Sequence, residues 1–314
     1  MAYSLKQIND AVRTDPQGFA QECDANYNKT IEAAARKIAD NLSKSRIVLL
    51  SGPSGSGKTT TAKKIEAKLE EMGIHSHAIA LDNYFQTVDP ETCPRNREGE
   101  IDYESPFCLD MDLLNRHFNL LDKGEKILVP KFEFARQMRS AIKSHPLQLG
   151  SDEIAIFEGI HALNDIITGK NRNAMKVYIS ARSDVVDEEG NVVYKRTWMR
   201  LARRTVRDAK FRAWEPDVTV KMWANVRRGE KLYISPFKDN ADIKFDSSQP
   251  CEVNVLKAFA QPAFDHLHLS SEMERYNEVH HLAEAFPRFE TLDEKFVAPD
   301  SLLREFIGGG IYDD

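Results

Sequence analysis

An eight-residue segment, Gly52-Pro-Ser-Gly-Ser-Gly-Lys-Thr59, follows a short apolar run and precedes a helical pattern. It matches the pattern G-x-x-x-x-G-K-[ST], in which glycines let the backbone curl so that several N–H groups point at a phosphate. A helix that begins at Lys58 would aim the positive end of its dipole at the same place. The segment therefore predicts a phosphate-binding loop between a strand and a helix. The alternative is a glycine- and serine-rich loop that fits the pattern by chance.

The positions of this loop have distinct expected roles. Lys58 would reach the terminal phosphates of a nucleotide, and the hydroxyl of Thr59 would hold Mg²⁺. ATP and Mg²⁺ are the expected cofactors, and no Asn-Lys-x-Asp guanine-binding motif follows the loop. We expect the loop to bind ATP through Gly52, Ser54, Gly55, Ser56, Gly57, Lys58, Thr59 and Thr60.

Four short apolar runs, separated by helical patterns, indicate the fold class. The runs cover 46–51, 77–81, 154–157 and 176–180, and helical spacing covers 13–44 and 58–72. Strands that alternate with helices are typical of a parallel sheet with helices on both faces. We therefore predict a three-layer α/β/α nucleotide-binding fold with surface or irregular segments at 86–99 and 183–191. The expected parts are an N-terminal helical extension (1–44), a core (45–250) and a C-terminal helical extension (251–314) packed on the core.

Composition excludes several classes of protein. The 314 residues are 41% hydrophobic and 29% charged, with a net charge of −6, which argues against a disordered chain. Apolar runs are only a few residues long, and the first ten residues have no apolar stretch. We therefore expect no membrane span, no signal peptide and a cytoplasmic location. The four cysteines are scattered (Cys23, Cys93, Cys108 and Cys251), which favours reduced thiols over a disulfide framework or a zinc site.

Acidic residues follow two of the predicted strands. Asp82 comes after the second strand, which we expect beside the strand of the phosphate loop, and it could accept the proton of a substrate hydroxyl. Glu158 ends the third strand, where it could support Mg²⁺. The alternatives are that Asp82 only caps the next turn and that Glu158 is a solvated residue at the end of its strand.

Four arginines repeat at helical spacing and share one face of a predicted helix: Arg200, Arg203, Arg204 and Arg207. Like charges on one stripe repel one another unless an anion lies against them. We therefore predict an arginine-rich lid helix that clamps ATP and stabilises the charge on the transferring phosphoryl group. The alternatives are a solvated face relieved by neighbouring acids and a nucleic-acid-binding patch, although the interleaved aromatic residues that such a patch needs are missing.

Together these segments resemble the uridine kinase and phosphoribulokinase family of P-loop kinases from about residue 30 to the end. The resemblance is strongest to a bacterial branch in which the kinase follows a TGS domain. Only about forty residues precede the core, so we expect this chain to lack that domain. The resemblance to the family rests on the segments 51–60, Leu81-Asp-Asn-Tyr-Phe85, 99–104, Phe157-Glu-Gly-Ile-His161, 200–208, 222–230 and 301–309.

The resemblance implies roles for particular residues. Asp82 would be the catalytic base, with Lys58 and Arg207 assisting, and Thr59 and Glu158 would serve Mg²⁺. Glu104 would bind the ribose hydroxyls. Arg203 and Arg207 would reach the phosphates of ATP. The expected substrate-side residues are Tyr84, Glu104, Phe132, Arg139, Arg204 and Arg212.

The chain also departs from the pattern of pyrimidine nucleoside kinases at three positions. Phe132 replaces a tyrosine, Gln137 a histidine and Trp214 an arginine, so the polar groups that would bind the base are replaced by apolar or uncharged ones. Loss of such hydrogen bonds changes which substrate is accepted. We expect a kinase that phosphorylates a small-molecule hydroxyl, most plausibly the 5′-hydroxyl of a nucleoside such as uridine or cytidine. The alternatives are a sugar or polyol kinase and a nucleotide-binding regulator without turnover.

Other features suggest no chemistry. The histidines His266, His268, His280 and His281 lack the cysteine or carboxylate pattern of a metal site and are interpreted as surface or packing residues. The C-terminal phenylalanines are interpreted as core or dimer packing, which leaves a homodimer open: Phe286, Phe289, Phe296 and Phe306. We expect no nucleic-acid or membrane partner.

Overall fold

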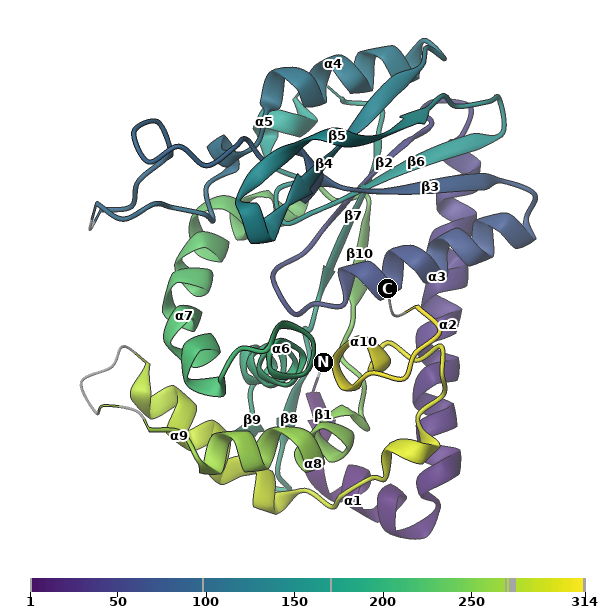
Figure 1. The fold of residues 1–314 in the computed structure, drawn as a ribbon. Helices are drawn as coiled ribbons and strands as arrows, with labels where there is room; N and C mark the ends of the chain where they lie inside the picture. The colour runs from purple at the N-terminus through teal and green to yellow at the C-terminus, as the bar shows by residue number, and fades with distance from the viewer. Residues whose placement is uncertain (1, 98, 170, 269, 271–274, 313–314) are drawn as a thin grey trace.

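The computed structural model describes residues 2–97, 99–169, 171–268, 270 and 275–312 (Figure 1). Its centre is a five-stranded parallel sheet with the strand order β10-β7-β2-β6-β3. The strands span β10 (Ile243–Asp246), β7 (Met175–Ser180), β2 (Ile47–Ser51), β6 (Glu153–Glu158) and β3 (His75–Ala80). All four predicted strands are therefore present, and β10 was not predicted.

Alternate residues of the central strand face two separate cores, which explains its continuous apolar sequence. In β2, Val48 and Leu50 belong to one buried cluster, whereas Ile47 and Leu49 belong to the other. Parallel strands that are covered on both faces lose the apolar–polar alternation of half-exposed strands. The three-layer α/β/α prediction is confirmed.

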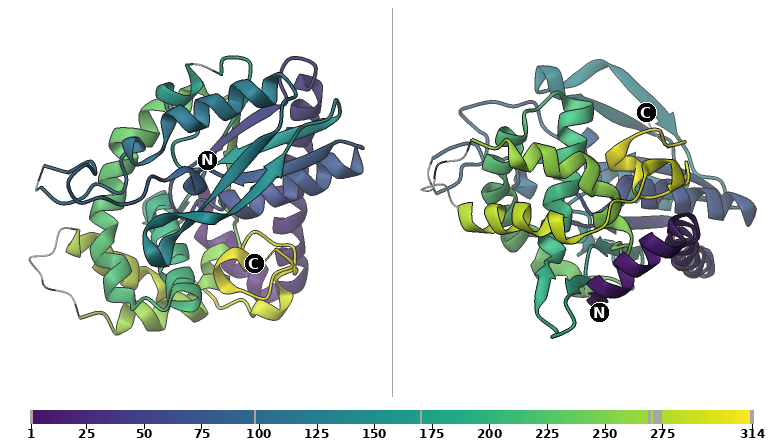
Figure 2. Two further views of the ribbon diagram at one scale, coloured as in Figure 1. Left: turned by 45° about the horizontal axis from the view of Figure 1, so that its top comes forward. Right: turned by 90° about the horizontal axis from the view of Figure 1, so that it is seen from below.

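Four helices that are far apart in the sequence cover the face of the sheet to which Val48 and Leu50 point. They are α2 (Pro16–Asn41), α3 (Lys58–Glu71), α6 (Arg196–Arg212) and α8 (Glu252–Asp265). The second face is covered by α4 (Met111–Asp122) and by a β-hairpin of β4 (Ile127–Glu133) and β5 (Met138–Leu147). Figure 2 shows these layers from two further directions. The arrangement leaves the carboxyl ends of the parallel strands at one edge of the sheet.

The remaining elements are short and lie around these layers. A small second sheet has the order β1-β8-β9, with β1 (Ala2–Ser4), β8 (Asp184–Val186) and β9 (Val192–Tyr194). The other helices are α1 (Leu5–Thr14), α5 (Asp165–Thr168), α7 (Pro216–Gly229), α9 (Tyr276–Ala285) and α10 (Arg304–Ile307). None of the helices in the described part of the chain is long and apolar enough to cross a membrane.

Two of our secondary-structure predictions were wrong in detail. The helix predicted over 13–44 is two helices, because Asp15 caps the second and Pro16 occupies its first turn. The Asp15 side chain accepts a hydrogen bond from the N–H of Gly18. The segment 183–191, predicted to be irregular, contains β8 and the turn that follows it.

The terminal segments are part of the main core. The hydroxyl groups of Tyr27 in α2 and Thr61 in α3 lie 2.6 Å apart. Ile31 and Ile38 of α2 and Leu302 and Phe306 near the C-terminus are buried in the same cluster as the sheet. All four cysteines are free thiols, as predicted. The terminal helices therefore stabilise the sheet face that carries the phosphate loop.

Candidate active site

The phosphate loop occupies the turn between β2 and α3, as predicted. Gly55 and Gly57 have φ values of 72° and 82°, in the left-handed region that favours glycine. A Cβ atom on Gly55 would lie 2.8 Å from the carbonyl oxygen of Arg200. Both the backbone conformation and the close approach of α6 therefore require glycine at position 55.

Arginines of α6 hold the loop from behind. Arg200 donates a hydrogen bond to the carbonyl oxygen of Ser54 (3.2 Å), and Arg203 donates one to that of Gly55 (3.1 Å). Arg204 donates to the hydroxyl oxygen of Ser54 (2.8 Å). These contacts hold the backbone of the loop against α6.

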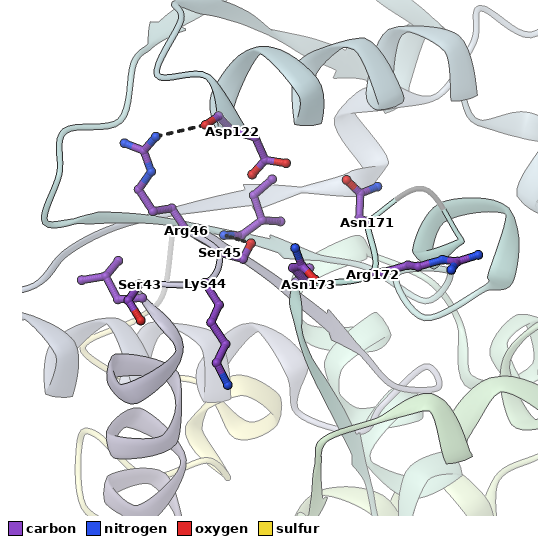
Figure 3. A pocket seen from close by; sticks show the side chains of 11 residues that line it. Ser43, Lys44, Ser45, Arg46, Asp122, Asn171, Arg172 and Asn173 are labelled. Atoms are coloured by element: carbon purple, nitrogen blue, oxygen red, sulfur yellow. Dashed lines mark hydrogen bonds between the residues drawn. The ribbon is translucent and has the colours of Figure 1, made fainter.

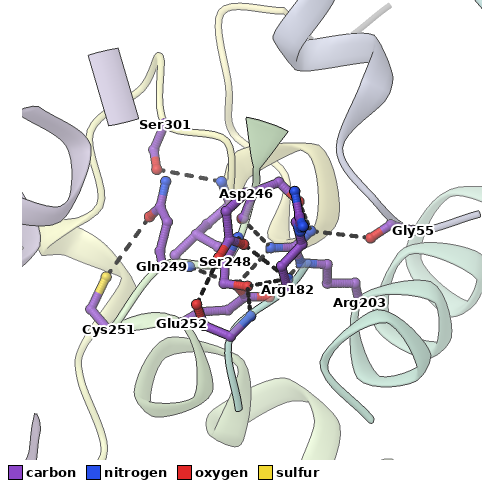
Figure 4. Close-up of polar contacts among 12 residues, drawn as sticks. Gly55, Arg182, Arg203, Asp246, Ser248, Gln249, Cys251, Glu252 and Ser301 are labelled. Carbon is purple, nitrogen blue, oxygen red and sulfur yellow. Dashed lines mark hydrogen bonds and ion pairs between the residues drawn. The ribbon is translucent and has the colours of Figure 1, made fainter. Parts of the chain in front are cut away.

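Arg203 is a supporting residue, and our prediction that it contacts ATP is corrected. Its side chain is 0% exposed and forms a bidentate ion pair with Glu252 of α8 (Figure 4). Its remaining N–H groups donate to Gly55 and Ser247. Because all five guanidinium N–H groups have protein acceptors, none is left for a phosphate.

The other arginines also have acidic partners. Arg200 pairs with Glu230 at 2.8 Å. The buried Asp208 lies within ion-pair distance of Arg204 (3.2 Å), Arg207 (2.9 Å) and Arg212 (3.4 Å). Neighbouring acids thus compensate the charge of the stripe, but three of its four arginines are buried, so it is not the solvated face of the alternative above. Arg207 and Arg212 keep exposed fractions of 17% and 48% and remain able to meet a ligand.

Two carboxylates lie at the carboxyl edge of the sheet beside the loop. Glu158 is the last residue of β6, and Asp82 lies in the 3₁₀ turn Leu81–Tyr84 that follows β3. One expectation was wrong: the strand before Asp82 pairs with β6 and not with β2. Strand order depends on how the connections cross the sheet, and local sequence does not encode it. Both carboxylates still reach the loop, because parallel strands end at one edge.

Desolvation and two nearby positive charges act on the carboxyl group of Asp82. The Asp82 side chain is exposed, but the surrounding protein partly removes it from water, and this desolvation raises the pKa of its carboxyl group. The positive charges of Lys58 and Arg212 act in the opposite direction. Asp82 therefore lies within electrostatic reach of the loop lysine.

Glu158 has the features of a magnesium-site residue. Desolvation raises the pKa of Glu158 to about 7, and Lys58 opposes this shift. The hydroxyl of Thr59 lies 3.5 Å from its Oε1. Its Oε2 is buried, with no hydrogen-bond partner in the part of the chain that the structure describes. A buried carboxylate oxygen without a partner next to a hydroxyl is a donor set that fits Mg²⁺.

Glu104 is placed by a network that our sequence interpretation missed. Its N–H donates to Oδ1 of Asp102 (3.3 Å), and Asp102 is held by Arg228 (2.9 Å) and Tyr233 (3.0 Å). Desolvation raises the pKa of Glu104 to about 7, and the positive charge of Arg204 opposes this. No local pattern around Asp102 indicates these partners, because they lie more than a hundred residues away.

Two predicted substrate residues, Tyr84 and Arg139, make structural contacts in this geometry. Tyr84 is 0% exposed, and its hydroxyl lies 2.9 Å from Nδ1 of His117 in the second core. Arg139 donates to Asp110 (2.9 Å) and to the carbonyl oxygen of Tyr84 (3.2 Å), so it anchors the hairpin. The predicted contact of Tyr84 with substrate is corrected, whereas Arg139 is 27% exposed and its contact with substrate stays a prediction. Phe132 is buried against Phe85 and stays a predicted substrate-side residue.

Two cavities lie at opposite edges of the sheet. One of about 320 Å³ adjoins the loop and is lined by residues of α3, α6 and the C-terminal segment, among them Thr59, Thr60, Arg207, Arg212, Arg304 and Glu305. The other, of about 460 Å³, lies at the amino ends of β2 and β7, where Arg46 donates to the carbonyl oxygen of Asp122 (Figure 3). The first cavity continues the phosphate loop, and we assign it to the active site.

Comparisons with known proteins found a matching family model, relatives of similar sequence and similar solved structures. The model of the "Phosphoribulokinase / Uridine kinase family" matches residues 47–254. A uridine kinase from Staphylococcus aureus (strain JH9) is 29% identical over 198 residues, which are 63% of this chain and 85% of that protein. A solved structure from Silicibacter sp. TM1040, provisionally assigned as a fructose transport system kinase, is similar with a TM-score of 0.50 at 20% identity. That match covers 68% of this chain and 98% of the other. The structural likeness shows the fold.

Proposed function

The chain belongs to the phosphoribulokinase and uridine kinase family and is a phosphotransferase acting on a hydroxyl group. We propose that it phosphorylates the 5′-hydroxyl of a nucleoside with ATP and Mg²⁺. The observation that carries the proposal is the exposed carboxylate of Asp82 within electrostatic reach of Lys58. The uridine kinase relative supports a nucleoside as the acceptor.

In the proposed reaction, the acceptor oxygen attacks the γ-phosphorus as the bond to the β–γ bridging oxygen breaks, and ADP leaves. Lys58 and the N–H groups of the loop hold the phosphates. Asp82 takes the proton of the acceptor hydroxyl. Thr59 and Glu158 would hold Mg²⁺, which neutralises phosphate charge when bound. Arg207 and Arg212 stabilise negative charge on the transferring group.

On the acceptor side, Glu104 would accept hydrogen bonds from the sugar hydroxyls. Arg204 influences Glu104 electrostatically and would contribute positive charge to the same region. Phe132 packs against Phe85 and Phe134 and would supply an apolar wall. Because Phe132, Gln137 and Trp214 replace the tyrosine, histidine and arginine of pyrimidine nucleoside kinases, a sugar or polyol kinase is the second candidate.

A panel of acceptors separates these candidates. Nucleosides, sugars and polyols are each added to the protein with ATP and Mg²⁺, and the release of ADP is measured. The proposal predicts stimulation by nucleosides above all other acceptors. Stimulation by sugars or polyols alone would favour the second candidate. Tight ATP binding without stimulation by any acceptor would indicate a regulator.

The acceptor site should respond to pH through Glu104. Because the pKa of Glu104 is raised to about 7, its carboxylate is protonated below that pH and ionised above it. The charged groups that influence Glu104 are Arg204, Asp102, Asp82 and Lys58. We expect kcat/KM for the acceptor to fall by up to about tenfold per pH unit below pH 7. In Glu104→Gln the plateau should be lower and the decline shallower but not abolished, because Glu158 titrates in the same range, and an unchanged profile would contradict the assignment.

A further inference from the structure

The C-terminal segment, residues 300–312, lies against the first turns of α3. Figure 1 shows α10, which contains Glu305, near this helix. Lys64 pairs with Asp300 (2.6 Å), and Lys63 donates to the carbonyl oxygen of Tyr312 (2.7 Å). The N–H of Thr60 donates to Oε2 of Glu305 at 3.0 Å. A carboxylate from a distant part of the sequence thus touches the end of the helix that carries the phosphate loop.

The N–H of Thr60 is a group that a phosphate would use. The first N–H groups of a helix have no acceptor within the helix, and Gly57 provides no side-chain cap for α3. The next residue, Thr61, already donates to the carbonyl oxygen of Gly57 at 3.0 Å. In a phosphate loop these free N–H groups point at the phosphates of the nucleotide. Glu305 therefore occupies a donor that the loop presents to an anion.

The position of Glu305 also opposes phosphate electrostatically. Its carboxylate lines the cavity of about 320 Å³ together with Arg207, Arg212 and Arg304. Its negative charge is one of the influences that raise the pKa of Glu158. A phosphate at the N–H of Thr60 would be repelled by the Glu305 carboxylate that accepts from the same N–H.

The segment can release this carboxylate without unfolding. Its anchors are fully buried side chains, including Leu302, Phe306 and Ile307, whereas Glu305 is partly exposed. A change of the Glu305 rotamer would take the carboxylate away from Thr60 while the anchors stay in place. The side chain alone is therefore able to act as the moving part.

We propose that Glu305 is a gate of the nucleotide site: it occupies the N–H of Thr60 when no nucleotide is bound, and a phosphate group of the incoming nucleotide displaces it. The proposal rests on the proposed function, since it needs a nucleotide at this loop. It makes the C-terminal segment a determinant of nucleotide affinity. Removal of the competing charge should therefore strengthen nucleotide binding.

The test compares Glu305→Gln with the unaltered protein and with Glu294→Gln, a control for loss of charge at an exposed position of the same C-terminal region. Glutamine keeps an acceptor for Thr60 but forms a weaker, uncharged hydrogen bond. Titration calorimetry measures the Kd for ATP and for inorganic triphosphate, and thermal unfolding verifies that each variant is folded. We expect both ligands to bind Glu305→Gln about tenfold more tightly, equivalent to ~1.4 kcal/mol, with no change in Glu294→Gln.

The outcomes separate the gate from the proposed function. Equal ATP affinity in the unaltered protein and Glu305→Gln would overturn the gate alone. Tighter binding of ATP by Glu305→Gln without tighter binding of inorganic triphosphate would also overturn the gate, because Glu305 would then not compete with the phosphates. If neither protein bound ATP, the gate and the proposed function would fail together.

Discussion

Replacement of Asp82 by asparagine should lower turnover by about a hundredfold or more while ATP binding is retained. Asparagine has nearly the same shape as aspartate but cannot accept the proton of the acceptor hydroxyl. The loop that holds the phosphates is built from β2 and α3, and Asp82 is no part of it. Steady-state kinetics with the best acceptor measures kcat, and titration calorimetry measures the Kd for ATP.

The control for this variant is Asp89→Asn, an exposed aspartate in the loop that follows the same 3₁₀ turn. We expect kcat of Asp89→Asn to stay within about a factor of two of the unaltered protein, because surface substitutions have small effects. Turnover in Asp82→Asn equal to that of the control would remove Asp82 from its proposed role. Loss of ATP binding in Asp82→Asn would mean that its role is in binding the nucleotide.

Replacement of Arg203 by methionine should reduce the free energy of unfolding by about 3–5 kcal/mol. Arg203 and Glu252 are both 0% exposed, and removal of the guanidinium leaves the Glu252 carboxylate buried without its partner. Such a loss is a large share of the roughly 5–15 kcal/mol that a folded domain has in total. The carbonyl oxygen of Gly55 also loses its donor. Chemical denaturation should therefore show a lower midpoint, and ATP should bind more weakly.

Two further variants distinguish the effect of breaking the buried Arg203–Glu252 ion pair from the general effect of removing an arginine. Arg36→Met removes an arginine whose side chain is 68% exposed, next to Glu32, and should change stability by less than about 0.5 kcal/mol. Arg203→Met combined with Glu252→Leu should recover much of the stability lost in the single variant, because no uncompensated charge remains. A single variant as stable as Arg36→Met would contradict the structural role of Arg203.

The phosphate loop and its flanking elements could be predicted because their signals are local. The glycines, Lys58 and Thr59 are close in sequence, and the apolar run before them has the length of a buried strand. The same holds for Glu158 at the end of its strand. In contrast, β5 is exposed over most of its length, so no apolar pattern marked the hairpin.

Partners that are distant in sequence could not be predicted. Arg203 was assigned to ATP because its four-arginine stripe was visible, whereas its partner Glu252 is 49 residues away. Glu305 is 245 residues from Thr60, and nothing near either residue indicates the contact. Tyr84 was assigned to substrate from its place in a motif, but the direction of a side chain in a 3₁₀ turn depends on packing against α4. These long-range contacts determine which predicted site residues are buried and which stay accessible.

The most direct measurement follows labelled γ-phosphate from ATP to the acceptor in the presence of Mg²⁺. For the unaltered protein we expect a labelled phosphoester of at least one nucleoside in the panel, formed together with ADP. For Lys58→Ala we expect almost none, because both the affinity for ATP and the transfer step depend on this lysine. A protein that binds ATP tightly but transfers label to no acceptor, or one whose transfer is unaffected by Lys58→Ala, would contradict the account.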